Sequence, residues 1–392
     1  MSSHSSENGD KSGLPQLAGS AMPGGALKKW RAGVLGATGL VGQRLIKLLA
    51  GHPWFELTEV AASERSSGKT YAEAVRWHLD GPIPETARSL IVKGLEPSLE
   101  CDFVFSALDS SVAGDAEEDF ARAGYPVVSN SKNHRMDPDV PLLIPEVNAA
   151  HLDAIRTQQK NRGYNGGFIV TNPNCSTAGL VLVLKPLADS FGLEKVFAVT
   201  LQAVSGAGYP GVASMDIHAN VIPFISGEEE KMESEPQKLL GKWDGARFID
   251  AGLGLSAHCN RVPVLEGHLE CISVSLKKIA SLKEVCEVLR HFDSAELGAL
   301  PSAVRHPVVV LDGEDRPQPR RDVHTGDGMA AVVGRIRECP LLDIKLTLLS
   351  HNLVRGAAGG ALLNAELLAA RGFLNHRVHA EGEKQLPQPV GR

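Results

Sequence analysis

Cys175 is the residue whose setting most clearly predicts chemistry. It lies in the segment TNPNCSTAG, between an apolar run at 167–171 that predicts a strand and an apolar run from 175 onward that predicts a helix. A thiol in the first helical turn faces unpaired backbone N–H groups and the positive end of the helix dipole, which favour the thiolate. The alternative is an inert core position, because a free cysteine packs as a small hydrophobic residue. The polar turn formers around Cys175 favour a nucleophile.

Two distant residues would suit a nucleophilic cysteine. Arg261 and His268 flank a turn in CNRVPVLEGHLE, just before a strand predicted at 269–276, and QAVSGAGYPG (202–211) predicts a strand that runs into a glycine-rich loop. A lone histidine is more often a satisfied polar side chain than a base. Its combination with an arginine that can bind an anion and with a cysteine elsewhere in the chain is typical of nucleophilic catalysis.

A glycine-rich turn predicts a nucleotide site near the start of the folded region. The motif GATGLVG (36–42) follows an apolar run at 33–35 and precedes a helix predicted at 43–50. Glycines allow a tight turn and a close approach of the backbone, and the helix N-terminus receives a phosphate. The spacing is GxxGxxG instead of GxGxxG, so a purely structural turn is the alternative.

The loop after the second predicted strand (57–62) bears on which dinucleotide binds. It contains Glu64, which could bind a ribose 2′-OH, but also the hydroxyls and cations of Ser63, Arg65, Ser66 and Lys69, which favour a 2′-phosphate. We therefore expect NADP, with a solvated charged loop as the alternative.

A third polar cluster, VVSNSKNHR (127–135), also follows a strand. Asn130, Lys132, His134 and Arg135 could hold a phosphate or a carboxylate there. A surface loop would have a similar composition.

The elements that must position these residues predict two domains. Short apolar runs alternate with helical ones between residue 28 and about 170, which is typical of βαβ units and a parallel sheet. From about residue 196 longer runs, such as 197–204 and 341–349, predict a mixed sheet with helices on one face. A final helix at 355–371 is expected to pack back on the first domain, and both chain ends (1–27 and after 373) are expected to be disordered tails.

Composition limits the class of protein. The chain has 392 residues, a net charge of −6 and 22% charged residues, as an ordinary soluble protein of two domains would. Nothing indicates nucleic acid binding, a membrane span or a signal peptide. Six scattered cysteines without CxxC pairs argue against a zinc site and against a disulfide scaffold. We expect an intracellular, cytoplasmic protein without a metal site.

The motifs together resemble one enzyme family. GATGLVG, ASERSSGK, VVSNSKNHR, TNPNCSTAG, SGAGYPG, GEEEKM and NRVPVLEGHLE, in this order and spacing, are similar to the aspartate-semialdehyde dehydrogenases, and to their archaeal and fungal branch in particular. The likeness covers about residues 30–373. Lys132 and His134 stand where many family members carry serine or a hydrophobic residue.

The resemblance implies NADPH-dependent reductive dephosphorylation of 4-phospho-L-aspartate to L-aspartate 4-semialdehyde, on the route to lysine, threonine and methionine. It implies an α/β fold with a Rossmann-like NADP-binding domain (28–171, completed by the helical segment 353–373). An α+β domain with a mixed sheet (172–352) would serve catalysis and oligomerisation as a homodimer or homotetramer, and 1–27 and 374–392 would be tails.

The resemblance also implies a role for each site residue. Cys175 would form a thioester and His268 would take the thiol proton. Arg261 would bind the substrate carboxylate, Arg135 and Lys231 the phosphate, and Glu228 the ammonium group, while Gln202 and Asn174 would orient the thioester carbonyl. The implied NADP contacts are Gly36, Thr38, Gly39, Leu40, Val41 and Gly42 at the pyrophosphate, Ser63, Arg65 and Ser66 at the 2′-phosphate, Ser106, Ala107 and Leu108 at the ribose, and Gly206, Ala207, Gly208 and Asn352 at the nicotinamide.

Three alternatives remain at this stage. N-acetylglutamyl-phosphate reductase and glyceraldehyde-3-phosphate dehydrogenase share the architecture, but their nucleophile segments usually read NPGCY and SNASCTTN. Pro173 and Asn174 before Cys175 favour the aspartyl enzyme. An NADP-binding sensor protein is the non-enzymatic alternative, and the presence of the cysteine, the histidine and the arginines argues against it.

Overall fold

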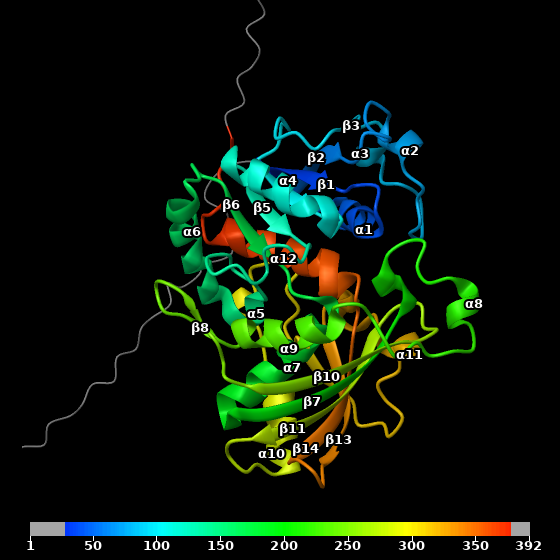
Figure 1. Ribbon diagram of the computed structural model, residues 1–392, viewed down its shortest axis with the longest axis vertical. Coiled ribbons are helices and arrows are strands. Elements are labelled where there is room, and N and C mark those ends of the chain that lie inside the picture. The colour runs from blue at the N-terminus through cyan, green and yellow to red at the C-terminus, as the bar shows by residue number, and fades with distance from the viewer. Residues whose placement is uncertain (1–27, 378–392) are drawn as a thin grey trace, which may run out of the picture.

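The computed structural model of the chain describes residues 28–377 (Figure 1). The N-terminal tail expected at 1–27 and most of the C-terminal tail, 378–392, lie outside the described residues. Figure 1 shows a parallel sheet with its helices at one end of the molecule and a mixed sheet at the other.

The first sheet is parallel throughout and has the strand order β3-β2-β1-β4-β5-β6. This is the order of dinucleotide-binding folds, and the predicted Rossmann-like domain is confirmed. Its strands are β1 (Trp30–Leu35), β2 (Phe55–Ala61), β3 (Val92–Lys93), β4 (Phe103–Ser106), β5 (Pro126–Ser129) and β6 (Phe168–Thr171). Its helices are α1 (Leu40–Leu49), α2 (Tyr71–Ala74), α3 (Glu85–Arg88), α4 (Ser110–Arg122), α5 (Pro145–Asn148) and α6 (Ala154–Arg162).

The inner strands of this sheet are buried on both faces, which explains their continuous apolar sequences. All residues of the inner strands β4 and β5 are buried, and so are those of the edge strand β6. Parallel strands end at one common edge, so the polar segments that follow β1, β4, β5 and β6 meet there. The strand order reverses between β1 and β4, where open sheets of this kind bind ligands.

The second sheet is mixed and has the order β10-β7-β11-β14-β13-β12, as the sequence predicted. Its strands are β7 (Leu193–Gln202), β10 (Gly254–Arg261), β11 (His268–Leu276), β12 (Val308–Val310), β13 (Ala331–Glu338) and β14 (Ile344–Ser350). Buried and more exposed residues alternate along β7 and β11, so the helices cover one face. These helices are α7 (Cys175–Phe191), α9 (Glu228–Leu239) and α10 (Leu282–His291); the short elements are α8 (Ser214–Ile217), β8 (Lys242–Trp243), β9 (Phe248–Ile249) and α11 (Pro319–Asp322).

The chain returns to the first domain after β14. A π-helical turn, Val354–Ala358, leads into α12 (Gly359–Ala370), whose leucines join the core of the parallel sheet. Figure 1 shows α12 lying between the two sheets. Arg355 in the turn makes a bidentate, buried ion pair with Glu146, with both Nη–Oε distances at 2.7 Å. This pair fixes the turn that passes behind Cys175.

Residues 374–377 pack against the parallel sheet, although the sequence suggested a tail from 374. Leu374 is buried, and the ring of His376 stacks on Trp30. Asp102 accepts a hydrogen bond from the backbone of Arg377 and contacts His376 Nδ1. The polar sequence of this segment concealed these contacts, which depend on a carboxylate far away in the chain.

Residues 28–377 have neither a membrane-spanning helix nor a cluster of metal ligands. Every helix in this range is too short or too polar to span a membrane. The same residues contain no group of three or more histidine, cysteine, aspartate and glutamate side chains placed to hold a metal ion.

Candidate active site

A cavity of about 580 Å³ lies where the carboxyl ends of the parallel strands meet the loops of the second domain. Both domains contribute to its wall. The residues predicted from the sequence that line it are Thr38, Gly39, Leu40, Val41, Ala107, Leu108, Asn130, Lys132, Arg135, Asn174, Cys175, Gly206, Ala207, Gly208, Lys231 and Asn352. The glycine-rich turn, the segment at 127–135, the nucleophile segment and the loop at 206–208 therefore meet at one site.

Cys175 is the first residue of α7, as expected. Asn174 caps this helix: its side-chain oxygen accepts hydrogen bonds from the backbone N–H groups of Ser176 and Thr177. The π-helical turn passes directly behind the cysteine, and a Cβ on Gly356 would lie 2.6 Å from the Cβ of Cys175. Glycine is thus required at 356 so that the two segments can approach.

His268 is the partner of the thiol. Its Nε2 lies 3.2 Å from Cys175 Sγ, and its Nδ1 accepts a hydrogen bond of 3.1 Å from the backbone N–H of Ala203. Because Nδ1 is an acceptor, a neutral ring carries its proton on Nε2, which points at the sulfur. The resting geometry therefore makes His268 a hydrogen-bond donor to Cys175.

Burial keeps the thiol of Cys175 and the imidazole of His268 neutral. Burial, together with the carboxylate of Glu228, raises the pKa of the Cys175 thiol to about 12, against the opposing effect of Lys231 and the nearby arginines. Burial also lowers the pKa of His268 to about 3. The expectation that the helix N-terminus would yield a thiolate is wrong for this state. The N–H groups of Ser176 and Thr177, which were expected to stabilise the thiolate, already bond to Asn174, and both burial and the nearby carboxylate of Glu228 disfavour a negative charge on the sulfur.

Glu228 and Lys231 form a charged pair beside the nucleophile. Lys231 Nζ lies 2.5 Å from Glu228 Oε2, and Asn174 Nδ2 donates to Glu228 Oε1 over 2.9 Å. Burial raises the pKa of Glu228, but the charge of Lys231 and the two hydrogen bonds outweigh it and hold this pKa below its usual value. Glu228 is therefore a carboxylate next to Cys175.

Arg135 is held by a residue that sequence reasoning missed. Its Nη1 donates to Glu235 Oε1 over 2.8 Å, and the other oxygen of Glu235 accepts the backbone N–H of Asn174 over 2.6 Å. Glu235 is buried on α9, one helical turn after Lys231. It thus ties the predicted phosphate-binding arginine to the turn that carries the nucleophile. Its position in the acidic sequence EEEKMESE gives no sign of this role.

Arg261 and Gln202 lie below the cavity, at the ends of neighbouring strands. Arg261 Nη1 donates to the carbonyl oxygen of Ala203 over 2.7 Å, and Gln202 donates to Thr200. Gly206 brings the glycine-rich loop against both functional side chains, since a Cβ there would lie 2.8 Å from Arg261 Nη1 and 3.0 Å from His268 Cε1. This close approach explains a glycine at 206.

The nucleotide side of the cavity fits a dinucleotide phosphate. Gly36 has φ of +74°, and a Cβ there would lie 2.4 Å from the carbonyl oxygen of Ala107. Gly42 is equally crowded, since its Cβ would lie 2.3 Å from the Gly36 oxygen. No side chain caps α1, whose N-cap is Gly39. The first amides of α1 can therefore bind a phosphate.

Two parts of the predicted NADP site lie apart from the cavity wall. Ser63, Arg65 and Ser66 form an exposed or half-buried turn after β2. Ser106 is buried, and its hydroxyl donates to Glu117 over 2.6 Å instead of facing a ribose. Ser106 is the last residue of β4, and alternation along the strand directs its side chain inward.

Comparisons with known proteins agree with this architecture. A family model described as the semialdehyde dehydrogenase NAD binding domain matches residues 31–155, and one described as the semialdehyde dehydrogenase dimerisation domain matches residues 184–355. The chain is 50% identical over 341 residues to an aspartate-semialdehyde dehydrogenase of Archaeoglobus fulgidus, covering 87% of this chain and 98% of the relative. It is 47% identical over 362 residues to that of Candida albicans, covering 88% and 99%.

A solved structure shows the same likeness in three dimensions. The crystal structure of aspartate-semialdehyde dehydrogenase with NADP from Candida albicans superimposes with a TM-score of 0.81 at 46% identity, and the match covers 88% of this chain and 100% of that one. Fold, site geometry and sequence therefore agree: the chain belongs to the semialdehyde dehydrogenase family, among the aspartate-semialdehyde dehydrogenases with archaeal and fungal relatives.

Proposed function

We propose that this chain catalyses the NADPH-dependent reductive dephosphorylation of 4-phospho-L-aspartate to L-aspartate 4-semialdehyde through a thioester on Cys175. The contact of 3.2 Å between Cys175 Sγ and His268 Nε2 carries this proposal. It lies beside a cavity lined by Arg135 and Lys231 and next to the loop that fits a dinucleotide phosphate. A nucleophile, two cations and a cofactor cradle are what this reaction requires.

The chain's own residues account for the acyl-transfer step. The Cys175 thiolate attacks the carbonyl carbon of the acyl phosphate, a C–S bond forms, and the C–O bond to phosphate breaks. Arg135 and Lys231 neutralise the departing phosphate. NADPH supplies the hydride that converts the thioester to the aldehyde, and the thiolate leaves.

Proton transfer passes through His268. The resting ring donates from Nε2, so it stabilises the thiolate and the oxyanion that forms during hydride transfer. To accept the thiol proton, the neutral ring needs a free lone pair on Nε2, so its own proton must sit on Nδ1. A protonated Nδ1 cannot accept the hydrogen bond from Ala203 N–H, so that bond must break. That bond therefore favours the donor role, and the base role expected from the sequence requires a change of tautomer.

Substrate selection follows from the remaining side chains. Arg261 offers a planar guanidinium for the α-carboxylate. Glu228 offers a carboxylate for the α-ammonium group, and Gln202 and Asn174 lie where they can orient the carbonyl. A free amino group distinguishes the aspartyl substrate from N-acetylglutamyl and glyceraldehyde substrates, and Glu228 is the matching charge.

The assignment to NADP extends to the turn after β2. Ser63, Arg65 and Ser66 would bind the 2′-phosphate, and Gly206, Ala207, Gly208 and Asn352 would contact the nicotinamide. The side chain of Asn352 is fixed by two hydrogen bonds: it accepts one from Gly267 N–H over 2.9 Å and donates one to Ser205 Oγ over 2.9 Å. We also propose that the chain works in the cytoplasm as a homodimer or homotetramer formed by the domain at 172–352.

One assay separates this function from its nearest alternatives. Purified protein is tested for NADP⁺ reduction in the presence of phosphate with aspartate semialdehyde, N-acetylglutamate semialdehyde or glyceraldehyde 3-phosphate. We expect turnover with aspartate semialdehyde and rates lower by orders of magnitude with the other two. Preference for another aldehyde would reassign the substrate, and NADP binding without turnover of any aldehyde would favour a sensor protein.

A further inference from the structure

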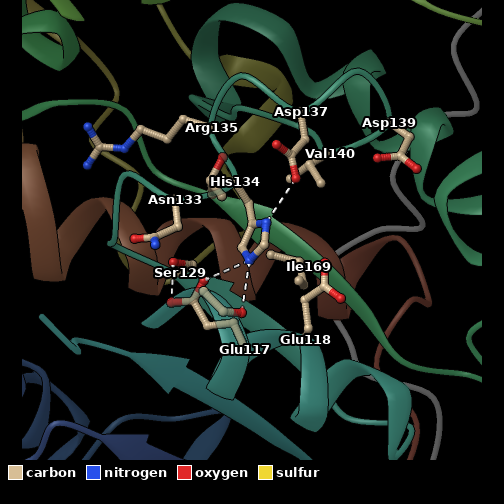
Figure 2. A network of polar contacts seen from close by, with 12 residues as sticks. Glu117, Glu118, Ser129, Asn133, His134, Arg135, Asp137, Asp139, Val140 and Ile169 are labelled. Carbon is tan, nitrogen blue, oxygen red and sulfur yellow. Dashed lines mark hydrogen bonds and ion pairs between the residues drawn. The ribbon is translucent and has the colours of Figure 1, made fainter. Parts of the chain in front are cut away.

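The loop that carries Arg135 has an inner side that the proposed reaction does not use. Asn130, Lys132 and Arg135 line the cavity, but His134 is 7% exposed and points the other way. Figure 2 shows its ring directed toward Glu117 while the side chain of Arg135 extends away from it. His134, which directly precedes Arg135 in the sequence, is thus buried in the first domain.

Both ring nitrogens of His134 face acceptors. Nδ1 lies 2.9 Å from Asp137 Oδ2, and Nε2 lies 3.2 Å from the Gly114 carbonyl oxygen and 3.9 Å from Glu117 Oε2. A neutral imidazole has a single N–H group and can satisfy one side only, whereas an imidazolium satisfies both. Burial lowers the pKa of His134, but the bond to Asp137 and the charge of Glu117 outweigh it and raise this pKa above its usual value.

Glu117 fixes the ring to the ends of two strands. Its Oε1 accepts from the hydroxyls of Ser106 and Ser129 over 2.6 and 2.7 Å. Ser129 Oγ in turn accepts the backbone N–H of Ser131, over 3.0 Å, at the start of the loop. Burial raises the pKa of Glu117, against the two serine bonds and the charge of His134. Glu117 therefore couples the ring to the edge of the sheet where the cavity lies.

Other charged groups also hold the loop. Arg162 donates to Asp137 Oδ2 over 2.8 Å and contacts Asp139 and Glu118. On the opposite side, Lys238 Nζ donates to the carbonyl oxygens of Arg135 and Asp137 over 2.8 and 2.7 Å. Burial lowers the pKa of Lys238 to about 7, so this lysine is the competing source of any pH dependence.

We propose that His134, as an imidazolium clamped between Asp137 and Glu117, is a positioning residue that holds Arg135 and Lys132 in place for phosphate. Loss of the ring proton leaves a lone pair on Nε2 facing a carbonyl and a carboxylate, or breaks the bond to Asp137. The first outcome repels the ring from α4 and the second repels it from Asp137, so either one moves the loop. Affinity for phosphate should therefore fall as the pH rises through the titration of His134. This inference rests on the proposed function, because phosphate is the probe.

The test is the KM for inorganic phosphate in NADP⁺-dependent oxidation of aspartate semialdehyde, from about pH 6 to about pH 10. We compare the wild type with His134→Gln. At each pH, the KM of the variant for phosphate is divided by that of the wild type, which cancels the ionisation of phosphate itself. Loss of a charge-assisted hydrogen bond predicts a ratio of roughly tenfold at low pH. The ratio should approach one at high pH, with the KM for NADP⁺ unchanged.

Two further variants keep the test decisive. Glu117→Gln removes one of the two carboxylates that face the His134 ring. The pH at which the KM for phosphate rises should then be lower than in the wild type. His151→Gln removes another buried histidine, outside this loop, and should leave the wild-type profile intact.

Two results would overturn the inference. These are a ratio of one at every pH, and a raised ratio that does not change with pH, which would assign any remaining pH dependence to Lys238 or to phosphate itself. Failure of the proposed function looks different, since the wild type would then not oxidise aspartate semialdehyde at any phosphate concentration.

Discussion

The two sides of the cavity are built differently. On the substrate side, Cys175 is hydrogen-bonded to His268, and hydrogen bonds join a neighbouring group of four residues, Asn174, Glu228, Glu235 and Arg135. On the cofactor side, the turn at 63–66 is largely exposed, and its backbone bonds are local. The substrate half is thus preorganised for the proposed chemistry, whereas the turn proposed to bind the 2′-phosphate is not held by hydrogen bonds to distant parts of the described chain.

Removing the nucleophile should separate the two halves most strongly. Cys175→Ser should lower semialdehyde oxidation with NADP⁺ and phosphate on the order of 10⁴-fold or more, because a hydroxyl is a far weaker nucleophile than a thiolate. Steady-state kinetics and NADP binding by fluorescence check this. Binding should stay near the wild-type value, and retained turnover would remove Cys175 from the mechanism.

The pH profile of alkylation tests the neutral resting state of the substrate half. A thiol pKa of about 12 instead of 9.0 lowers the thiolate fraction at neutral pH about a thousandfold. The rate of iodoacetamide reaction with Cys175 should therefore rise about tenfold per pH unit up to about pH 10 without a plateau. A plateau near neutral pH would instead reveal a thiolate–imidazolium pair. Cys175→Ser serves as the blank for the other cysteines.

Arg261→Lys examines the substrate half without touching the nucleophile. A point charge cannot reproduce a bidentate guanidinium, so kcat/KM for aspartate semialdehyde should fall roughly 10- to 100-fold. The KM for NADP⁺ should not change. Unaltered kcat and KM for the semialdehyde would place the substrate carboxylate elsewhere.

The smallest effect is expected on the cofactor side. Arg65→Ala should raise the KM for NADP⁺ roughly tenfold and leave the KM for NAD⁺ alone, because only NADP carries the 2′-phosphate. Arg122→Ala, which removes an exposed cation on α4 outside this turn, is the control for a general loss of positive charge. Equal losses with both cofactors would show that Arg65 does not distinguish them.

The sequence predicted the parts of this molecule that depend on local pattern. Apolar runs located several strands of each sheet, among them β2, β6, β7, β11 and β14, but not β3, β10, β12 or β13. The Asn-Pro turn before Cys175 and the glycines at 36–42 marked two turns that line the cavity. These signals are local because turn geometry and the periodicity of apolar residues are set by residues that are neighbours in the sequence.

The supporting contacts were not predictable in this way. Glu235 reads as one acidic residue among many, yet it connects Arg135 to the backbone of Asn174. The state of Cys175 was mispredicted because burial, which the sequence does not show, outweighed the helix N-terminus. The inward turn of Ser106 toward Glu117 likewise depends on a helix that packs beneath its strand.

The most direct test of the account traps the intermediate. Wild-type protein is mixed with aspartate semialdehyde and NADP⁺ without phosphate, and then digested at low pH for mass spectrometry. We predict a burst of about one NADPH per active site and an aspartyl adduct on the peptide that contains Cys175, which disappears when phosphate is added. The absence of a burst, or an adduct on a different residue, would contradict thioester chemistry at Cys175.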